Sequence, residues 1–295
     1  MASESSLPSD LVQLRPGLGI LRLAALHAEG GNDFDEETLD SMFELMEAGV
    51  LEETPPTEMW PELLRGLMGA APSRTIVALR ESGALAIVLP EVAALFGVPQ
   101  LADNSVGTVD LGYHLLNALS EAAKCGAPLE VRFALLVMNV GKFDSPKEHL
   151  PVHYRHIERG QPRIEAICDR FGAPDSCREL ALLALAECER VHRVSEVRAG
   201  PIAAMLERIH AFDDREMFNR LMTVCTCDYR SYEENFGKDY PKAAVLGKAI
   251  RACDDEVDDT LEPDEVGSAE AMDAIRTARA AAIADALRSV RWTNR

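Results

Sequence analysis

The stretch Leu136-Val137-Met138-Asn139-Val140-Gly141-Lys142 is the most informative part of this chain. Its apolar residues extend the apolar sequence that precedes them, and together they predict a buried helix over 130–139. This helix is expected to end in Met138 and Asn139, with a glycine and a basic residue following. A thioether is a soft ligand that suits Cu(I), and an asparagine offers only a neutral carbonyl oxygen. The pair is therefore poorly suited to the dications that activate water.

The composition favours an all-helical protein. The chain has 295 residues, of which 47% are hydrophobic and only 5% aromatic, and alanine and leucine are abundant. No run approaches the roughly 20 apolar residues of a membrane span, and the N-terminus lacks the features of a signal peptide. Seven cysteines, with Cys225 and Cys227 as the only close pair, indicate reduced thiols of a cytoplasmic protein.

The formal net charge of −19 disfavours nucleic-acid binding by the chain as a whole, because nucleic-acid-binding domains normally carry a basic surface. A phosphate contact would have to come from a local basic patch. Residues 142–163 are the candidate, since basic residues outnumber acidic ones there. The basic residues of this segment are Lys142, Lys147, His149, His153, Arg155, His156, Arg159 and Arg163.

Hydrophobic spacing predicts helices along most of the chain and no strand-like alternation longer than four residues. Residues 100–108 are expected to form a loop, and Ser73 to cap a helix over 74–82. The remaining helices are expected to begin near residue 17, to cover 36–48, to follow 55–57, and to cover 110–125, 130–139, 152–171, 175–191, 201–211, 214–231, 241–252 and 269–288.

Two proline-punctuated segments carry a family resemblance. Leu79–Leu85 followed by Leu89–Pro99 resembles the "L…GAL…lfPE…LfGVP" segment of bacterial CCA-adding tRNA nucleotidyltransferases of the type that bears an HD domain. Similar residues continue at Asp110–His114, Val131–Ala134, Gly141-Lys142, His153–His156 with Gly160, and Asp239–Pro241. The resemblance covers roughly residues 17–290 and implies an all-α fold, with a helical neck and body followed by an HD-like helical domain.

The resemblance and the composition together predict a division of the chain into segments. These are a disordered N-terminus at 1–15, a neck/body-like region at 16–104, a degenerate HD-like domain at 105–252, an acidic linker at 253–268 and a C-terminal helix at 269–295.

The HD site of the family implies four metal ligands, of which two are replaced here. His114 matches the first histidine and Asp228 the distant aspartate, whereas Met138 and Asn139 stand where the His-Asp pair would be. Two ligands on separate helices would hold a dication only weakly. We therefore expect no cofactor, and a buried His114 that is hydrogen-bonded to Asp228. The alternative is a weakly held divalent cation.

A rearranged metal site is the specific form of that alternative. His153 and His156 are spaced i, i+3 and are expected on one helical face, and the corresponding histidines of the family assist the HD site. Together with His114 and Asp228 they are the candidate ligands. By contrast, Cys188 has no histidine at a spacing that indicates a catalytic dyad.

Most of the residues that the family uses for nucleotidyl transfer are missing from this sequence. The family uses a β-sheet head with a glycine-rich phosphate loop and paired aspartates, and no such sequence precedes residue 17. Arg15–Gly19 replaces the acidic pair and arginine that read the incoming base, and Thr57 and Glu58 replace a Glu-Arg pair. We therefore expect no nucleotidyl transfer by this chain alone.

The 142–163 segment supplies the candidate phosphate contacts. Arg155, Arg159 and Arg163 are spaced i, i+4, i+8 and are expected along one helix face, and arginine forks suit phosphate. Glu158 and nearby Glu165 are equally good partners for them. Lys142, at the tip of the preceding loop, is the fourth candidate.

Three functions remain open. The first is a non-catalytic scaffold or binding module, whose partner is another protein, or a tRNA acceptor end or small phosphorylated molecule at the 142–163 segment. The second is a weak metal-dependent phosphohydrolase that uses the rearranged site. The third is a body subunit that supports CCA addition by a separate head protein. None of them involves a membrane.

Overall fold

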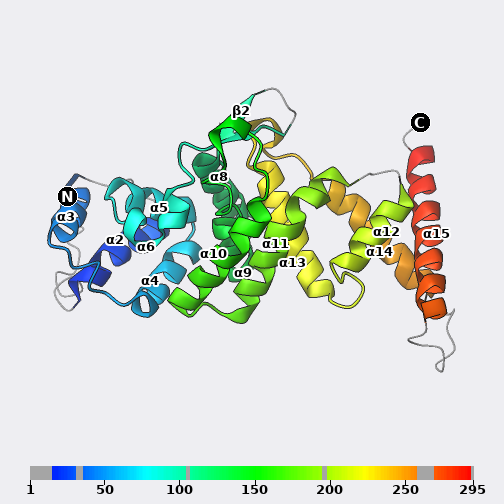
Figure 1. The fold of residues 1–295 in the computed structure, drawn as a ribbon, viewed down its shortest axis with the longest axis horizontal. Helices are drawn as coiled ribbons and strands as arrows, with labels where there is room; N and C mark the ends of the chain where they lie inside the picture. The colour runs from blue at the N-terminus through cyan, green and yellow to red at the C-terminus, as the bar shows by residue number, and fades with distance from the viewer. Residues whose placement is uncertain (1–14, 31–35, 104–106, 195–197, 258–268, 294–295) are drawn as a thin grey trace, which may run out of the picture. The chain divides into compact units, whose positions relative to one another are not determined.

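A computed structural model describes residues 15–30, 36–103, 107–194, 198–257 and 269–293 (Figure 1). They form two compact units, Met1–Leu185 with Cys227–Phe236, and Ala186–Thr226 with Gly237–Arg295. The all-α prediction is confirmed, because the regular structure is helical apart from one short hairpin. The segment boundaries expected from the sequence stay predictions.

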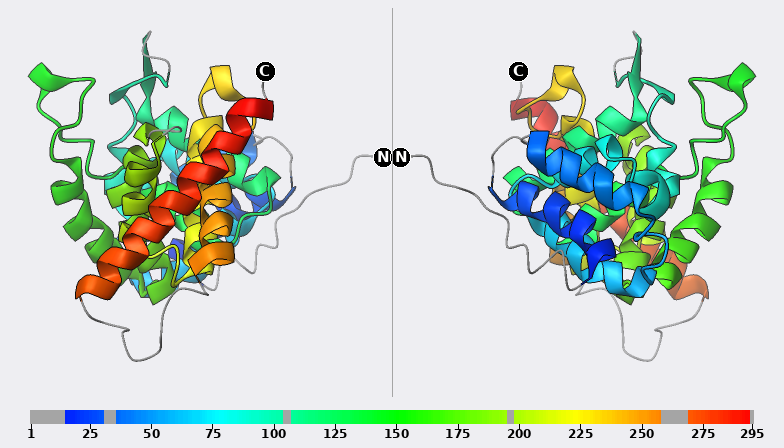
Figure 2. Two further views of the ribbon diagram at one scale, coloured as in Figure 1. Left: turned by 90° about the vertical axis from the view of Figure 1, so that its right-hand side faces the viewer. Right: turned by 90° about the vertical axis from the view of Figure 1, so that its left-hand side faces the viewer.

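The first unit begins with a helical bundle around α2. Its helices are α2 (Pro16–Gly30), α3 (Glu36–Glu47), α4 (Pro56–Met68), α5 (Pro72–Glu81), α6 (Leu85–Val88) and α7 (Pro90–Ala93). Helix α2 packs against α3, α4 and α5, and the right-hand view of Figure 2 shows α2 and α3 side by side. Ala24, Ala25 and Ala28 are fully buried, and their small side chains let the neighbouring helices approach closely.

Glycine is required where α4 meets α5. A Cβ atom added to Gly66 would lie 2.6 Å from the Thr75 hydroxyl oxygen. That hydroxyl is buried and donates a hydrogen bond to the Ala24 carbonyl on α2, at 3.2 Å. The close packing of these three helices therefore depends on the missing side chain at Gly66.

A short hairpin and four further helices follow in the chain. The elements are β1 (Pro99–Leu101), β2 (Thr108–Asp110), α8 (Leu111–Lys124), α9 (Leu129–Val137), α10 (His156–Phe171) and α11 (Asp175–Arg193). The strands pair antiparallel, so the expected loop at 100–108 instead contains part of a hairpin. The Asp110 carboxylate accepts hydrogen bonds from the backbone N–H groups of Gly112 and Tyr113, which fixes the start of α8.

The second unit is built on α12 (Ala199–Arg208), α14 (Pro241–Val257) and α15 (Ala269–Thr293), and α11 and α13 (Arg215–Arg230) contribute residues to both units. Helices α14 and α15 lie side by side in the left-hand view of Figure 2 and both contact α12. Buried Leu246, Ile250 and Ile283 form part of the interface. An amphipathic α15 thus completes an apolar core.

One expectation from the sequence is wrong, and others lie mostly outside the described residues. Ser73 does not cap a helix, because α5 already begins at Pro72 and has no side-chain cap. The expected linker at 253–268 begins inside α14, which continues to Val257. Residues 1–14 and 258–268 lie outside the described residues, and with them most of the predicted disordered and linker segments. No described helix combines the length and hydropathy that crossing a membrane requires.

A buried arginine on α9 joins three segments of the first unit. The Arg132 side chain donates hydrogen bonds to the carbonyl oxygens of Leu67, Gly69 and Ala127, at 3.0, 2.8 and 2.9 Å. Arg132 is only 5% exposed, so bulk water could not take over these hydrogen bonds if the side chain were removed. It therefore connects the end of α4 and the α8–α9 turn to α9.

Replacing Arg132 by methionine is expected to lower the free energy of unfolding by about 2–4 kcal/mol, because buried carbonyl oxygens would lose their donors. Urea denaturation followed by circular dichroism measures the change. Arg155→Met is the control, because Arg155 is exposed and should change stability by less than about 0.5 kcal/mol. Equal effects of the two substitutions would contradict this role of Arg132.

Candidate functional site

The centre of the candidate site is a buried pair on α8 and α13. The His114 Nε2 donates to the Asp228 carboxylate at 2.9 Å, and the Ser231 hydroxyl lies 2.8 Å from Nδ1. The Tyr232 ring lies against the imidazole, with 4.5 Å between the ring centroids. His114 is 3% and Asp228 7% exposed. The structure thus contains the hydrogen bond that the sequence predicts, and both imidazole nitrogens already face polar partners.

A series of hydrogen bonds connects Tyr232, whose ring contacts His114, to the hairpin. The Lys142 ammonium donates to the Gln100 side-chain oxygen at 2.7 Å, and the Gln100 amide donates to the Tyr232 hydroxyl at 2.8 Å. Lys142 is only 5% exposed. The sequence places Lys142 at a loop tip, but its charge lies in the interior and is hydrogen-bonded there, as a buried charge requires.

Met138 and Asn139 are both buried, at 5% and 6% exposure. They follow the last turn of α9, and the backbone N–H of Lys142 donates to the Asn139 carbonyl at 2.9 Å. A Cβ atom on Gly141 would lie 1.9 Å from the His156 carbonyl oxygen. Glycine is therefore required where this loop meets α10.

His153 and His156 do not share a helical face, which corrects the expectation from their spacing. Helix α10 begins at His156, because Arg155 has a left-handed φ of 56°, and His153 precedes the helix. The two nitrogens of His153 lie 2.9 Å from the Ser145 hydroxyl and 3.1 Å from the Pro99 carbonyl oxygen. The His156 Nδ1 donates to the His153 carbonyl at 2.8 Å. Both rings thus fix the backbone around the 141–155 loop.

Arg159 fixes the same loop with all its nitrogen atoms. Its guanidinium donates to the carbonyl oxygens of Gly141 and Tyr154, at 3.0 and 2.8 Å. It also donates to the Ser145 hydroxyl at 2.9 Å. An ion pair with Asp144 at 3.0 Å adds to this arrangement.

Arg163 also faces the loop. It donates to both oxygens of the Asp144 carboxylate and to the Val140 carbonyl, and its guanidinium lies 4.2 Å from the centroid of the Phe143 ring. The hydrogen bond from Arg163 holds the pKa of Asp144 below its usual value. Arg155, by contrast, is exposed and forms a surface ion pair with Glu158 at 3.4 Å. The predicted stripe of three phosphate contacts is thus reduced to one accessible arginine.

The structure does not gather the four candidate metal ligands. Among the described residues, His153 and His156 belong to no cluster of three or more potential ligand atoms. His114 and Asp228 bond to each other instead of facing a common space. The geometry supports a structural role for this pair.

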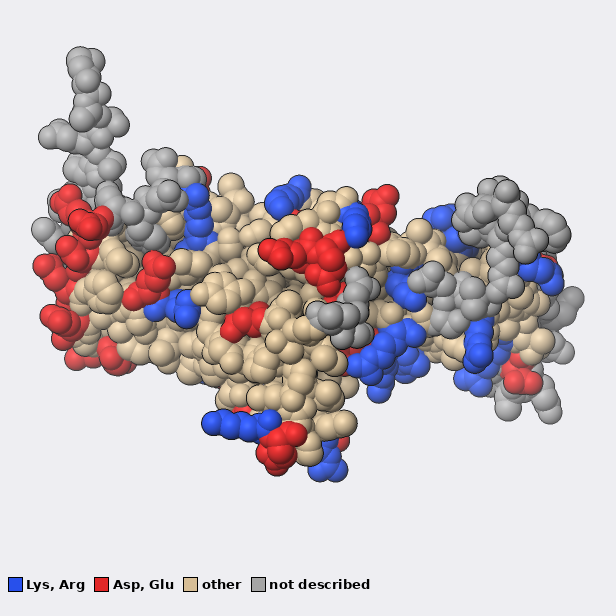
Figure 3. Space-filling model, turned by 90° about the horizontal axis from the view of Figure 1, so that it is seen from above, with Lys and Arg blue, Asp and Glu red and all other residues tan. Residues whose placement is uncertain are grey.

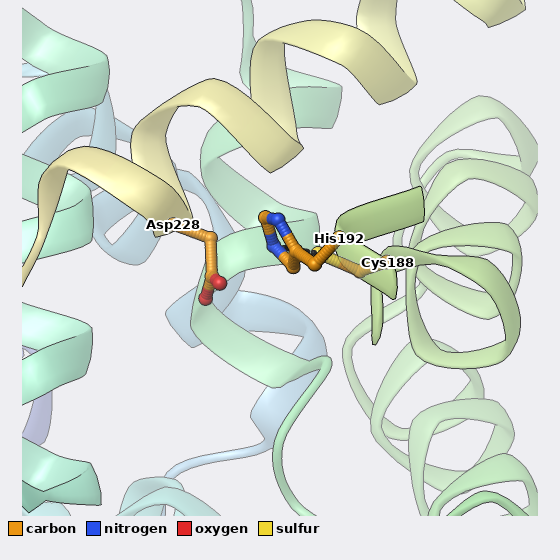
Figure 4. Close-up of side chains that lie close together, drawn as sticks. All are labelled: Cys188, His192 and Asp228. Carbon is orange, nitrogen blue, oxygen red and sulfur yellow. Dashed lines mark hydrogen bonds between the residues drawn. The ribbon is translucent and has the colours of Figure 1, made fainter. Parts of the chain in front are cut away.

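Sequence reasoning missed a cysteine–histidine pair within α11. The Cys188 sulfur lies 3.3 Å from the His192 Nε2, and Tyr240 lies 2.7 Å from the other ring nitrogen. The i, i+4 spacing puts both residues on one helix face, and this spacing is the signal that was available. Figure 4 draws the pair together with Asp228, which belongs to the first unit and is described there.

Comparisons with known proteins agree with the resemblance. A family model described as "Probable RNA and SrmB- binding site of polymerase A" matches residues 33–96. Multifunctional CCA proteins of Cupriavidus necator and Cupriavidus taiwanensis are 37% and 38% identical over 90% and 91% of this chain. This chain is related to the multifunctional CCA proteins. It covers 64% and 65% of those two relatives, and therefore spans less than two thirds of their length.

The segment that matches the RNA-binding model is strongly acidic in this relative of the multifunctional CCA proteins. Its only Lys or Arg residues are Arg65, Arg74 and Arg80. Arg65 is paired with Glu29 at 2.6 Å, and Arg80 lies over the Phe96 ring at 4.3 Å. Acidic side chains gather at the α3 end of the first unit (Figure 3), where the exposed residues are Glu36, Glu37, Asp40, Glu44 and Glu47. This surface repels phosphate.

Asp228→Leu is expected to lower stability by about 2–4 kcal/mol, because His114 would lose a buried partner. The double variant His114→Leu/Asp228→Leu should recover part of that loss, since neither polar group would then remain buried alone. Urea denaturation of both variants and of the single variant His114→Leu gives the coupling energy. The exposed His149→Leu is the control, and a coupling energy near zero would contradict a structural pair.

Proposed function

We propose that this chain is an RNA-binding helical module whose HD-like site supports the fold and does not hydrolyse phosphate esters. The observation that carries the RNA-binding part is the 37% identity to a multifunctional CCA protein over 90% of this chain. The match of residues 33–96 to an RNA-binding family model supports it. The RNA that fits this relationship is the acceptor end of tRNA.

The geometry of the first unit supports the non-catalytic part. Hydrolysis by a metal centre needs several ligands around an open coordination position. His114 and Asp228 are instead hydrogen-bonded to each other. The Met138 side chain is apolar and only 5% exposed. A rearranged site would require His153 to give up its contacts with Ser145 and Pro99. We therefore favour the binding module over the phosphohydrolase.

Charge indicates where such a module would contact phosphate. The acidic surface of α3 is unfavourable, and Lys142, Arg159 and Arg163 are engaged within the fold. The exposed basic residues of the 142–163 segment are Lys147, His149 and Arg155. Tyr154 is next to Arg155 and 59% exposed, so an aromatic face is available for stacking on an unpaired base. We assign the RNA contact to these residues of the loop before α10.

The test is the affinity of the full chain for tRNA, measured by fluorescence anisotropy between about 50 and about 300 mM salt. Binding should weaken steeply with salt. Arg155→Ala should reduce affinity about 3- to 10-fold and lower the magnitude of the salt slope by about 0.7–0.9, as expected for the loss of one phosphate contact. A tRNA lacking its 3′ terminal nucleotides should bind more weakly than the intact tRNA.

Arg193→Ala is a matched control. The side chains of Arg155 and Arg193 are 79% and 76% exposed. Arg155 pairs with Glu158 at the start of α10, and Arg193 pairs with Glu189 on α11. If Arg193→Ala and Arg155→Ala weaken tRNA binding equally, the assigned surface is wrong. If no binding occurs at the lowest salt concentration, the chain is not an RNA-binding module, and a protein partner becomes the leading interpretation.

A further inference from the structure

Two cysteines far apart in the sequence meet at the end of α8. The sulfur atoms of Cys125 and Cys227 are 4.0 Å apart, although 102 positions separate the residues in the chain. Cys125 follows α8 and is exposed, whereas Cys227 lies on α13 and is 2% exposed. Both belong to the first unit. The pair therefore combines an exposed cysteine with a buried one.

The backbone around Cys125 is held firmly by a helix-ending motif. Gly126 has a left-handed φ of 65° and donates its N–H to the Ala123 carbonyl, while the Ala127 N–H donates to the Ala122 carbonyl at 2.8 Å. These two bonds define a Schellman motif. The Ala127 carbonyl also accepts from the buried Arg132. The backbone position of Cys125 is thus a fixed feature of the α8–α9 turn.

The contact between the two thiols shifts their pKa values in opposite directions. A hydrogen bond from Cys227 lowers the pKa of Cys125 to about 6, and the Arg132 guanidinium acts in the same direction. The same contact and burial raise the pKa of Cys227. Glu121, the nearest carboxylate on α8, is paired with Lys124 at 2.6 Å. Cys125 is therefore the residue that a dissolved oxidant reaches first, because Cys227 is buried.

We propose that Cys125 and Cys227 are an oxidation site, at which a hydroperoxide converts the two thiols into a reversible disulfide. The Cys125 thiolate attacks one peroxide oxygen, which breaks the O–O bond, forms a sulfenic acid and releases an alcohol or water after protonation. The Cys227 sulfur then attacks the sulfenic sulfur, and the leaving hydroxyl departs with the Cys227 proton as water. Two thiols lose two electrons, which the peroxide gains.

The bond would connect two elements on which the HD-like pair depends. The sulfur atoms must approach from 4.0 Å to about 2.05 Å, which is a short movement for a side chain next to a helix end. Cys227 directly precedes Asp228, and Cys125 ends the helix that carries His114. Oxidation would therefore link α8 covalently to α13 beside the His114–Asp228 hydrogen bond.

Treatment of the reduced full chain with hydrogen peroxide, followed by alkylation and peptide mapping under non-reducing conditions, tests the proposal. The seven free thiols should fall to about five, because Cys125 and Cys227 form the disulfide. Dithiothreitol should restore both thiols. The chain should remain a monomer on a non-reducing gel. Cys125→Ser should oxidise at least about 10-fold more slowly, because the accessible thiolate is lost.

Cys168→Ser is the matched control, because Cys168 is buried and burial raises its pKa to about 11. This variant should oxidise at the wild-type rate. Cys227→Ala should stop at sulfenic or sulfinic acid on Cys125, a distinct mass from the disulfide. A cross-link between other cysteines, a bond between two chains, or Cys125 oxidised without a cross-link in the wild-type chain would overturn the proposal.

Discussion

The hydrogen bond between His114 and Asp228 connects two helices whose residues are 114 positions apart in the sequence. Around it, Ser231 and Tyr232 enclose the imidazole, and Gln100 links Tyr232 to Lys142 and the hairpin. Each member would be costly to bury without a partner. The arrangement therefore works as a unit that orders α8, α13 and the loop after α9, and its charges and polar atoms are used within the fold.

The loop after α9 has a specific shape, which contacts with α10 maintain. Gly141 has no room for a Cβ atom against α10, and Arg159 and Arg163 hold the loop from that helix. The resemblance implies that Met138 and Asn139 occupy the family's ligand positions, and both side chains are buried in this frame. On our proposal, the helical frame serves RNA binding, and the His114–Asp228 pair contributes to stability.

Hydrophobic spacing was sufficient to predict the all-α fold and the approximate position of most helices, because helix propensity and apolar periodicity are local properties. The pairing of His114 with Asp228 followed from the family resemblance. The start of α10 could not be predicted, because it depends on the left-handed backbone of Arg155 and on bonds from His153 to distant residues. Likewise, the burial of Lys142 depends on Gln100, and the meeting of Cys125 with Cys227 depends on tertiary packing.

Metal content is the most direct test of the claim that the HD-like pair is structural. The protein would be purified without chelator, soaked in Mn²⁺, Co²⁺ or Zn²⁺, desalted and subjected to elemental analysis, beside His114→Leu. The account predicts far less than one equivalent of each metal in the wild-type chain, and no decrease in the variant. Near-stoichiometric metal that disappears with His114→Leu would contradict it and would make phosphate-ester hydrolysis the leading function.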